Sequence, residues 1–377
     1  MFTTPHQQLF TPLTIGPMQL KHRVIMAPLT RSRSVQPDNV PGDLMLEYYT
    51  QRASDGGFII SEANQLSIAS RGWHGAPGIY SDAQAEGWKK IVDAVHEKGG
   101  HMFAQLWHPG RFSHTELTGG PTPVSASVDP SYWQDTSRLI STAHGWLQPS
   151  PHRALEVAEI PGIVDLHAEA VGRAKAAGFD GVEVHAGNGY LLDQFLQDSS
   201  NKRDDEYGGP IENRTRLLFE VVEAMTSAWE GNRIAVRITP GGTFNGMSDS
   251  DPNALSSHVA EGLNQFGLAY LHIIEPRVSG YFVAKEGLAP VASERLRKVF
   301  KGAIVANGGF EPDSAEAAIA TGVVDAVAFG RYFISNPDLP RRIQEGFPLA
   351  KYDHDTFYTF DARGYTDYLP YNELVAV

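Results

Sequence analysis

Residues 181–190 read Gly-Val-Glu-Val-His-Ala-Gly-Asn-Gly-Tyr, and the amphipathic run Leu191–Leu196 follows directly. The first half has the composition of a short buried strand, and the strand ends in a histidine, an asparagine and a tyrosine. Parallel α/β folds carry their active sites at the carboxyl ends of such strands, beside the helix that follows. This stretch therefore predicts a strand-to-helix unit and the chemical centre of the protein.

Similar apolar, β-rich runs recur along the chain, and helical patterns separate most of them. The predicted strands are 23–27, 58–62, 101–107, 181–185, 234–239, 270–275, 303–307 and 326–330. The predicted helices are 83–98, 164–177, 212–229, 253–266, 292–300 and 312–321. Eight buried strands alternating with helices is the count that closes a (β/α)8 TIM barrel of the α/β class. An open doubly wound sheet is the alternative, but no Gly-x-Gly-x-x-Gly turn follows the first strand.

We expect one domain over residues 1–377, with two additions to the barrel. Residues 13–22 hold a turn between two short apolar pieces and predict a β-hairpin cap at the bottom of the barrel. Residues 109–159, after the third strand, are rich in Pro, Ser, Thr and Trp and predict a lid over the barrel mouth. Tyr132, Trp133 and Trp146 are its expected packing points. The loops 241–252 and 277–290 also follow strands at that end.

Composition excludes several classes of function. The formal net charge is -13 and no basic cluster interrupts it, which argues against a nucleic-acid surface or an anionic membrane as partner. The start of the chain lacks a signal-peptide pattern, and no apolar run approaches membrane-spanning length, so we expect a soluble, cytoplasmic protein. The chain has no cysteine, which excludes disulfides, thiolate metal sites and a cysteine nucleophile. Any redox chemistry must come from a bound cofactor.

The last two strands end in the phosphate-binding chemistry of many barrels. Asn307, Gly308 and Gly309 follow one strand, and Gly330 and Arg331 follow the other. Glycine amides and a guanidinium in these two loops are the usual phosphate site of the fold. Each motif alone is equally a glycine turn with a surface arginine. The two together predict a phosphate site.

Polar residues end other strands. Gln105 and Arg237 could bond the edge of a flat heterocycle, although a buried ion pair or a capped carbonyl is the alternative for each. His185 and Asn188 are two donors that could polarise one carbonyl oxygen and so activate a conjugated alkene. Tyr190 carries a protonated phenol that could act as the acid, unless it only packs.

A metal site built on His185 is the competing interpretation of this centre. It would need two or three further ligands, and His108 and His114 could join only if their loop folded back. We therefore predict no metal. A barrel lyase that uses no redox cofactor also remains open, although no strand ends in a lysine able to form a Schiff base.

Longer motifs resemble those of the Old Yellow Enzyme family of FMN-dependent ene-reductases. They are Met26-Ala27-Pro28-Leu29-Thr30-Arg31, Gln105-Leu106-Trp107-His108, His185-Ala186-Gly187-Asn188-Gly189-Tyr190-Leu191, the run 200–214 and Phe329-Gly330-Arg331. The resemblance implies a (β/α)8 barrel, a tightly bound non-covalent FMN, and NADPH or NADH as reductant. It further implies reduction of the C=C bond of α,β-unsaturated carbonyl or nitro compounds, by ping-pong hydride transfer through flavin N5 with Tyr190 as proton donor.

The resemblance also distributes roles. The cofactor residues would be Pro28, Thr30, Ala63, Gln105, Arg237, Asn307, Gly308, Gly309, Phe329, Gly330 and Arg331. The substrate would contact His185, Asn188, Trp73, Trp107 and Tyr358. Trp73 stands where many members have a tyrosine, and the sequence after Tyr358 is closer to fungal members, which leaves substrate preference open. A dedicated reductase or isomerase of a secondary-metabolite pathway, such as an alkaloid pathway, is the alternative, and we expect a monomer or homodimer.

Overall fold

Eight parallel strands close into a barrel in the computed structural model, which describes residues 6–279, 282–283 and 291–374. Their order around the barrel is β10-β11-β12-β15-β16-β3-β4-β5. The strands are β3 (Val24–Met26), β4 (Phe58–Gln65), β5 (His101–Trp107), β10 (Gly181–Ala186), β11 (Ile234–Ile238), β12 (Tyr270–Ile274), β15 (Ile304–Asn307) and β16 (Ala326–Phe329). The predicted (β/α)8 barrel is confirmed. β4 extends past its predicted end through an irregularity between Ile60 and Ala63.

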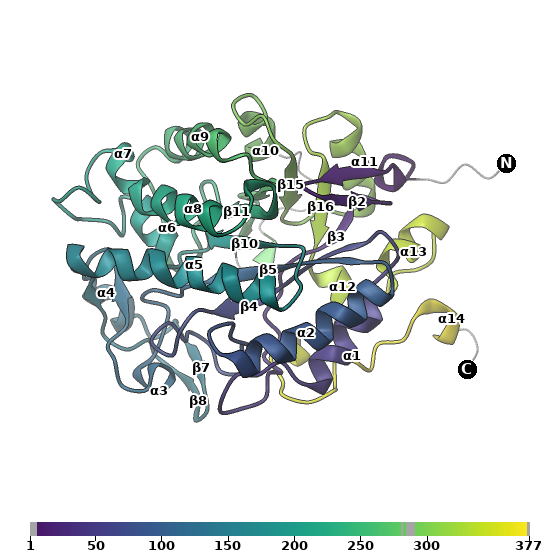
Figure 1. Ribbon diagram of the computed structural model, residues 1–377, viewed down its shortest axis with the longest axis horizontal. Helices are drawn as coiled ribbons and strands as arrows, with labels where there is room; N and C mark the ends of the chain where they lie inside the picture. Colours follow the sequence, from purple (N-terminus) through teal and green to yellow (C-terminus); the bar gives the residue numbers. More distant parts are fainter. Residues whose placement is uncertain (1–5, 280–281, 284–290, 375–377) are drawn as a thin grey trace.

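Helices surround these strands (Figure 1). They are α1 (Asp43–Arg52), α2 (Asp82–Glu97), α5 (Ile160–Ala176), α6 (Leu191–Leu196), α7 (Ile211–Arg214), α8 (Arg216–Ala228), α9 (Pro252–Leu263), α10 (Val291–Leu296), α11 (Pro312–Ala320), α12 (Arg331–Ser335), α13 (Leu339–Glu345) and α14 (Tyr371–Leu374). Short 3-10 turns are η1 (Gln8–Phe10), η3 (Gly231–Arg233), η4 (Phe244–Gly246), η5 (Asn264–Phe266) and η6 (His354–Thr356).

Two helix predictions need correction, and helix α1 was not predicted. The predicted helix 212–229 is two helices that meet at Thr215, whose hydroxyl bonds back to the Ile211 carbonyl (2.9 Å). The predicted helix 292–300 ends at Leu296. Helix α1 was missed, because its buried face includes two tyrosines and an arginine in addition to Met45, and so does not read as an apolar stripe.

A hairpin closes the amino end of the barrel, where it was predicted. β1 (Leu13–Ile15) pairs with β2 (Met18–Leu20), and their buried side chains join the cluster of residues that fills the barrel interior. The turn fits closely, since a Cβ on Gly16 would lie 2.1 Å from the Asn232 carbonyl oxygen. The amino end is therefore filled, and the carboxyl end is left for the site.

The insertion after β5 forms its own small elements. These are α3 (Thr115–Thr118), β6 (Val124–Ser125), α4 (Pro130–Gln134), β7 (Ile140–Thr142), β8 (Gly145–Leu147), β9 (Arg153–Ala154) and η2 (Val157–Glu159). In Figure 1, α3, α4, β7 and β8 lie at the end of the barrel opposite the hairpin β1–β2. Arg203 holds the insertion from outside, donating to the carbonyls of Ala126 (3.0 Å) and Leu155 (2.6 Å).

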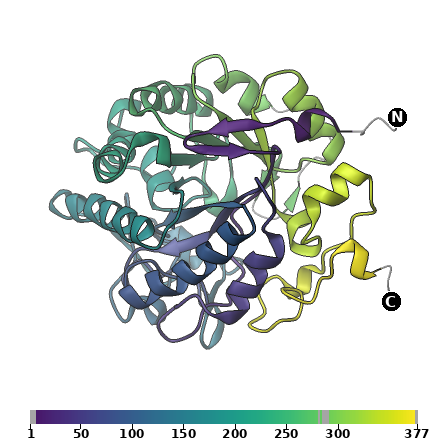
Figure 2. The ribbon, with the colours of Figure 1, turned by 45° about the vertical axis from the view of Figure 1, so that its right-hand side comes forward.

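The chain after α13 turns back along α1 (Figure 2). Arg31 bonds the carbonyls of Phe357 (3.1 Å) and Gly364 (2.6 Å), and the rings of Tyr48 and Tyr365 stack at 4.0 Å. This return brings residues 357–358 to the barrel mouth. The predicted loop 277–290 contains the pair β13 (Val278–Ser279) and β14 (Phe282–Val283), and its residues 280–281 and 284–290 lie outside the described residues. Along the described chain, no helix combines the length and apolarity needed to cross a bilayer.

Candidate active site

One cavity at the carboxyl ends of the strands is lined by every residue that the sequence predicted for the site. These residues are Pro28, Thr30, Ala63, Trp73, Gln105, Trp107, His185, Asn188, Tyr190, Arg237, Asn307, Gly308, Gly309, Phe329, Gly330, Arg331 and Tyr358. They come from seven of the barrel strands or the loops after them, and from the returning C-terminal segment. The fold thus brings together residues up to 330 positions apart, although their roles stay predictions.

The cavity also has lining residues that sequence reasoning missed. They include Leu29, Arg31, Phe112, Phe244, Phe310, Glu311, Tyr332, Tyr352 and Phe357. Tyr352 illustrates why: its hydroxyl lies 3.3 Å from an Arg331 nitrogen, but helix α13 separates the two residues in the chain. No local pattern in a single sequence announces such a contact.

Gln105, Glu183, Arg237 and His272 form a buried polar layer under the cavity, which we call the floor. The Gln105 amide nitrogen donates to one oxygen of Glu183 (2.7 Å), and His272 Nδ1 lies 2.8 Å from the other. Glu183 and His272 are fully buried. Glu183 was missed as a site residue, yet it stands two positions before His185 and so shares the inward face of β10.

Arg237 supplies the positive charge of the floor. One terminal nitrogen donates to the Asn307 amide oxygen (3.2 Å), and the Asn307 amide donates to the Ala328 carbonyl (2.6 Å). Burial lowers the pKa of Arg237, and the Glu183 carboxylate opposes that shift. Its Nε is buried and has no hydrogen-bond partner within the described residues. The Arg237 side chain itself lines the cavity, which places its guanidinium beside a ligand there.

His185 and Asn188 lie at the end of β10 with their nitrogens converging. Asn188 Nδ2 is 3.5 Å from His185 Nε2. Thr239 sets the Asn188 amide: its hydroxyl oxygen accepts the Asn188 backbone N–H (3.0 Å) and donates to the Asn188 side-chain oxygen (3.3 Å). The Asn188 NH2 group is therefore left to face His185, and both residues can donate to one oxygen.

Burial determines the protonation states of His185 and Tyr190. It lowers the pKa of His185 well below its ordinary value, and the nearby Arg237 and His272 lower it further. His185 is therefore a neutral donor at pH 7. Burial raises the pKa of Tyr190 above its ordinary value, so its phenol holds its proton. The two rings meet edge to face, with their centroids 5.1 Å apart.

The turn that carries Asn188 and Tyr190 is held in an unusual conformation. Asn188 has a φ of 56°, in the left-handed region. Its carbonyl accepts from the Asn245 side chain (2.9 Å), and the next N–H, of Gly189, donates to Asp193 (2.8 Å). A Cβ on Gly189 would lie 2.6 Å from the Asn245 Cβ, so only glycine fits there. Burial raises the pKa of Asp193 to about 6.

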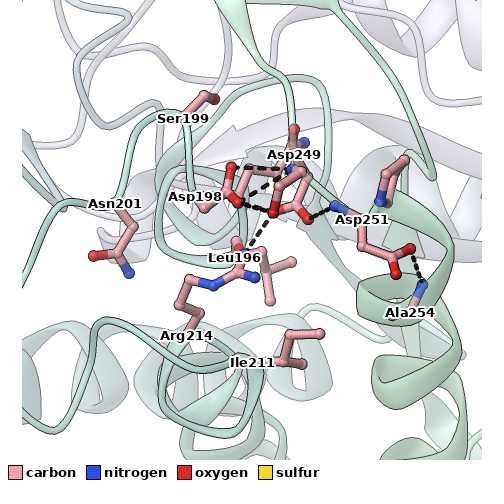
Figure 3. Close-up of polar contacts among 12 residues, drawn as sticks. Leu196, Asp198, Ser199, Asn201, Ile211, Arg214, Asp249, Asp251 and Ala254 are labelled. Carbon is pink, nitrogen blue, oxygen red and sulfur yellow. Dashed lines mark hydrogen bonds and ion pairs between the residues drawn. The ribbon is translucent and has the colours of Figure 1, made fainter.

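The loop that carries Asn245 is anchored from outside the barrel. Arg214 pairs with Asp249 at 2.6 Å, and both side chains are at least 95% buried, at 5% and 1% exposure. Figure 3 shows Arg214 pointing at Asp249, which also accepts the Asp198 N–H (2.9 Å). The run 200–214, singled out in the sequence, thus supports two walls of the cavity: the insertion through Arg203 and this loop through Arg214.

Four aromatic residues form a cluster at the cavity wall, and we call them the rim: Trp73, Phe112, Trp146 and Tyr358. Trp73 is central, with ring centroids 5.8 Å from Phe112, 5.2 Å from Trp146 and 5.0 Å from Tyr358. Trp146, on the β7–β8 hairpin, is 49% exposed. The rim extends the apolar wall of the cavity out to solvent.

Glycines border the far end of the cavity. Gly308 and Gly309 have φ values of 104° and 68°, and a Cβ on Gly308 would lie 3.1 Å from the Glu275 backbone nitrogen. Arg331 begins α12 directly after Gly330. Backbone that can approach closely, next to a guanidinium, suits a phosphate group.

No group of three or more His, Asp or Glu side chains is placed to hold a metal ion in the described part of the chain. His108 Nδ1 accepts the Gly110 N–H (3.1 Å), and burial lowers its pKa to about 3. His114 Nδ1 accepts the Glu116 N–H (3.2 Å) at the start of α3. Both residues thus make local contacts.

Residues 8–350 match the model of the NADH:flavin oxidoreductase / NADH oxidase family. The chain belongs to this family. The flavin oxidoreductase hxnT of Emericella nidulans is 43% identical over 97% of this chain and 98% of its own length. The structure of morphinone reductase in complex with tetrahydroNAD superposes with a TM-score of 0.88 at 45% identity, covering 96% of this chain and 97% of that chain. The Old Yellow Enzyme homologue from Zymomonas mobilis superposes with a TM-score of 0.89 at 45% identity, covering 96% and 99%.

The predicted Old Yellow Enzyme membership is thereby confirmed, and with it an NAD(P)H-dependent oxidoreductase that uses FMN. The cavity of this flavin oxidoreductase fits the cofactor. The Arg237 guanidinium and the Gln105 amide, both lining the cavity, suit the polar edge of a flat ring system, and the glycines with Arg331 suit its phosphate.

Proposed function

We propose that this flavin oxidoreductase reduces the C=C bond of α,β-unsaturated carbonyl or nitro compounds. When bound, FMN supplies a ring that takes up a hydride from NAD(P)H and passes it to the alkene. The observation that carries the proposal is the convergence of His185, Asn188 and Tyr190 on one side of a cavity whose floor holds a buried cation.

His185 and Asn188 would hold the substrate oxygen. Two N–H donors on one oxygen stabilise the negative charge that develops there when the far alkene carbon is attacked. Because His185 is neutral, it can donate without adding a second buried charge beside Arg237. Thr239 supports this role, since its contacts keep the Asn188 NH2 group facing His185.

Tyr190 would protonate the α-carbon. Its phenol is buried and protonated, and it lies edge-on to both His185 (5.1 Å) and Trp107 (5.1 Å). A positioned acid of this kind contributes about 10²–10⁴ to a rate. Trp73, Trp107 and Tyr358 would confine the rest of the substrate.

The nicotinamide and the alkene would use the same place in turn, because His185 and Asn188 would hold the amide of the one and the carbonyl oxygen of the other. The oxidised nicotinamide must then leave before the alkene binds. Ping-pong kinetics, with parallel double-reciprocal plots, are expected, and intersecting plots would count against a shared site.

The visible spectrum of the purified protein without oxygen tests the proposal. A yellow protein that bleaches with NADPH and recolours with 2-cyclohexenone is the expected result. Recolouring only in air would overturn the general ene-reductase activity in favour of a dedicated reductase. A protein that stays colourless when FMN is supplied would contradict the assigned cofactor.

The second candidate is a dedicated secondary-metabolite reductase or isomerase. The rim favours it, because Trp73 and the exposed Trp146 extend the apolar wall beyond what a small enone needs. A rigid polycyclic enone tested beside 2-cyclohexenone separates the two. A kcat/KM higher by tenfold or more for the polycyclic compound would favour the dedicated enzyme.

A further inference from the structure

A fully buried carboxylate in the floor has no role in the proposed reaction. Glu183 lies on β10, and its register partner on β5 is Gln105. Side chains alternate along a strand, so Glu183 and His185 both face the barrel interior, with Glu183 one layer deeper. Burying an ionised carboxylate costs free energy unless hydrogen bonds or charges compensate it. The groups that contact Glu183 therefore indicate its role.

Glu183 receives one N–H on each oxygen. His272 Nδ1 lies 2.8 Å from one oxygen, and the Gln105 side-chain nitrogen lies 2.7 Å from the other. His272 Nε2 is buried without a partner within the described residues, which matches a neutral imidazole with its proton on Nδ1. Both neighbours therefore act as donors to an ionised carboxylate.

The charge of Glu183 is maintained by its surroundings. Burial alone would raise its pKa, but His272, Arg237 and the Gln105 hydrogen bond outweigh burial and lower the pKa below its ordinary value. An ionised carboxylate accepts hydrogen bonds and donates none. The group of Gln105 that faces Glu183 must therefore be its NH2 and not its carbonyl oxygen.

This requirement determines whether the Gln105 side chain presents a hydrogen-bond donor or an acceptor to the cavity. The side-chain amide of Gln105 has one hydrogen bond within the described residues, the one to Glu183. With the NH2 group committed to the floor, the carbonyl oxygen is the group turned away from it. An acceptor at this place selects a ligand edge that carries an N–H, as the imide edge of the isoalloxazine ring does.

We propose that Glu183 is a positioning residue that fixes the Gln105 amide with its oxygen toward the cavity, and so makes the site read the ring N3–H of FMN. The inference rests on the proposed placement of Gln105 against the flavin ring. His272 completes the relay by holding the second oxygen of Glu183.

The substitution Glu183→Gln tests this without changing the size of the side chain. The new amide takes the His272 N–H on its oxygen and turns its NH2 toward Gln105, which must then rotate its own oxygen away from the cavity. We expect FMN to bind at least about tenfold more weakly, since one buried hydrogen bond is lost. With FMN labelled with 15N at N3, the N3–H proton resonance should move upfield.

Glu275→Gln is the matched control. Glu275 is also a buried carboxylate on the barrel, and it accepts the Ala292 and Ser293 N–H groups (3.0 Å each) without contact to Gln105. This variant should lose stability and leave the N3–H resonance unchanged. An unchanged resonance in Glu183→Gln would overturn the proposal.

Gln105→Leu separates this inference from the proposed site. If Gln105→Leu leaves the resonance unchanged, Gln105 does not face the ring and the proposed placement fails. If Gln105→Leu moves it and Glu183→Gln does not, only the role of Glu183 fails. Should Glu183→Gln not fold, unmodified protein can be titrated with 3-methyl-FMN, which lacks the N–H. Binding more than about tenfold weaker than FMN is expected, and equal affinity would overturn the inference.

Discussion

The floor and the rim of the cavity are built on opposite principles. The floor consists of buried polar side chains on neighbouring strands. Hydrogen bonds of 2.7 and 2.8 Å join Gln105, Glu183 and His272, and Arg237 bonds Asn307 at 3.2 Å. The rim consists of aromatic rings from loops and the C-terminal segment, in contact through their faces and edges at 5.0–5.8 Å. A ligand that needs one fixed orientation suits the floor, and ligands that vary suit the rim.

Physical chemistry explains this division. Hydrogen bonds between buried groups have narrow geometry and are costly to leave unpaired, so the floor admits few alternatives. Ring contacts tolerate many arrangements at similar energy. The cofactor should therefore depend on the floor, and substrate preference should depend on the rim.

Tyr190 contacts His185 and the rim residue Phe112, and its loss should give the largest effect. Tyr190→Phe should slow reoxidation of the reduced enzyme by 2-cyclohexenone about 10²–10⁴-fold, because the proton donor is lost. Reduction by NADPH should keep its rate. Stopped-flow absorbance measures both half-reactions. Tyr132→Phe makes the same change in a buried tyrosine of the insertion and should alter neither. Reoxidation at full rate would assign the proton to another acid.

Arg237 tests whether the floor binds the cofactor. Arg237→Met should weaken FMN binding about a hundredfold, since a charge-assisted hydrogen bond is lost from a buried site. Fluorescence titration of the apoprotein with FMN measures it. Arg342→Met removes another buried arginine, which is paired with Asp338 away from the cavity, and should reduce stability without changing FMN affinity. If both variants lost FMN affinity equally, the loss would reflect reduced stability and not a contact between Arg237 and FMN.

A third prediction concerns pH. Glu62 lies on β4 and accepts the backbone N–H of Arg31. Burial raises the pKa of this carboxyl group from 4.5 to about 7. Between these values the folded protein keeps a proton that the unfolded chain releases, so the free energy of unfolding falls as pH rises through that window. Glu62→Gln should remove about 2 kcal/mol of this dependence. Urea denaturation at pH 5 and pH 7 measures the free energy of unfolding. An equal change between the two pH values in both proteins would contradict the prediction.

The rim should give the smallest effect. Trp146→Ala should raise KM for a bulky aromatic enone about threefold to tenfold, and leave KM for 2-cyclohexenone and the FMN affinity unchanged. Steady-state kinetics with both substrates measures the difference. Trp133→Ala removes an indole of the same insertion that contacts His152, outside the rim, and should change neither KM. A loss of FMN affinity in Trp146→Ala would contradict the claim that cofactor binding depends on the floor and substrate preference on the rim.

Much of the site was predictable because it follows strand ends. His185, Arg237 and Gly330 come directly at the end of apolar runs, and a closed parallel barrel places all such positions at one end. Glu183 could have been found by the alternation with His185. The Tyr352 contact to Arg331 and the support of Asn188 by Asn245 could not, because loops determine them.

The sequence by itself determined the barrel, the strand ends that carry the chemistry and the family, since periodicity and short motifs are local properties of the chain. Only the tertiary structure decided which way the amides of Gln105 and Asn188 face. Their orientation depends on Glu183, His272 and Thr239, which reach them across strands. Hydrogen bonds between strands far apart in the chain leave no periodic signal. The direction of a donor or acceptor is therefore a property of the folded barrel.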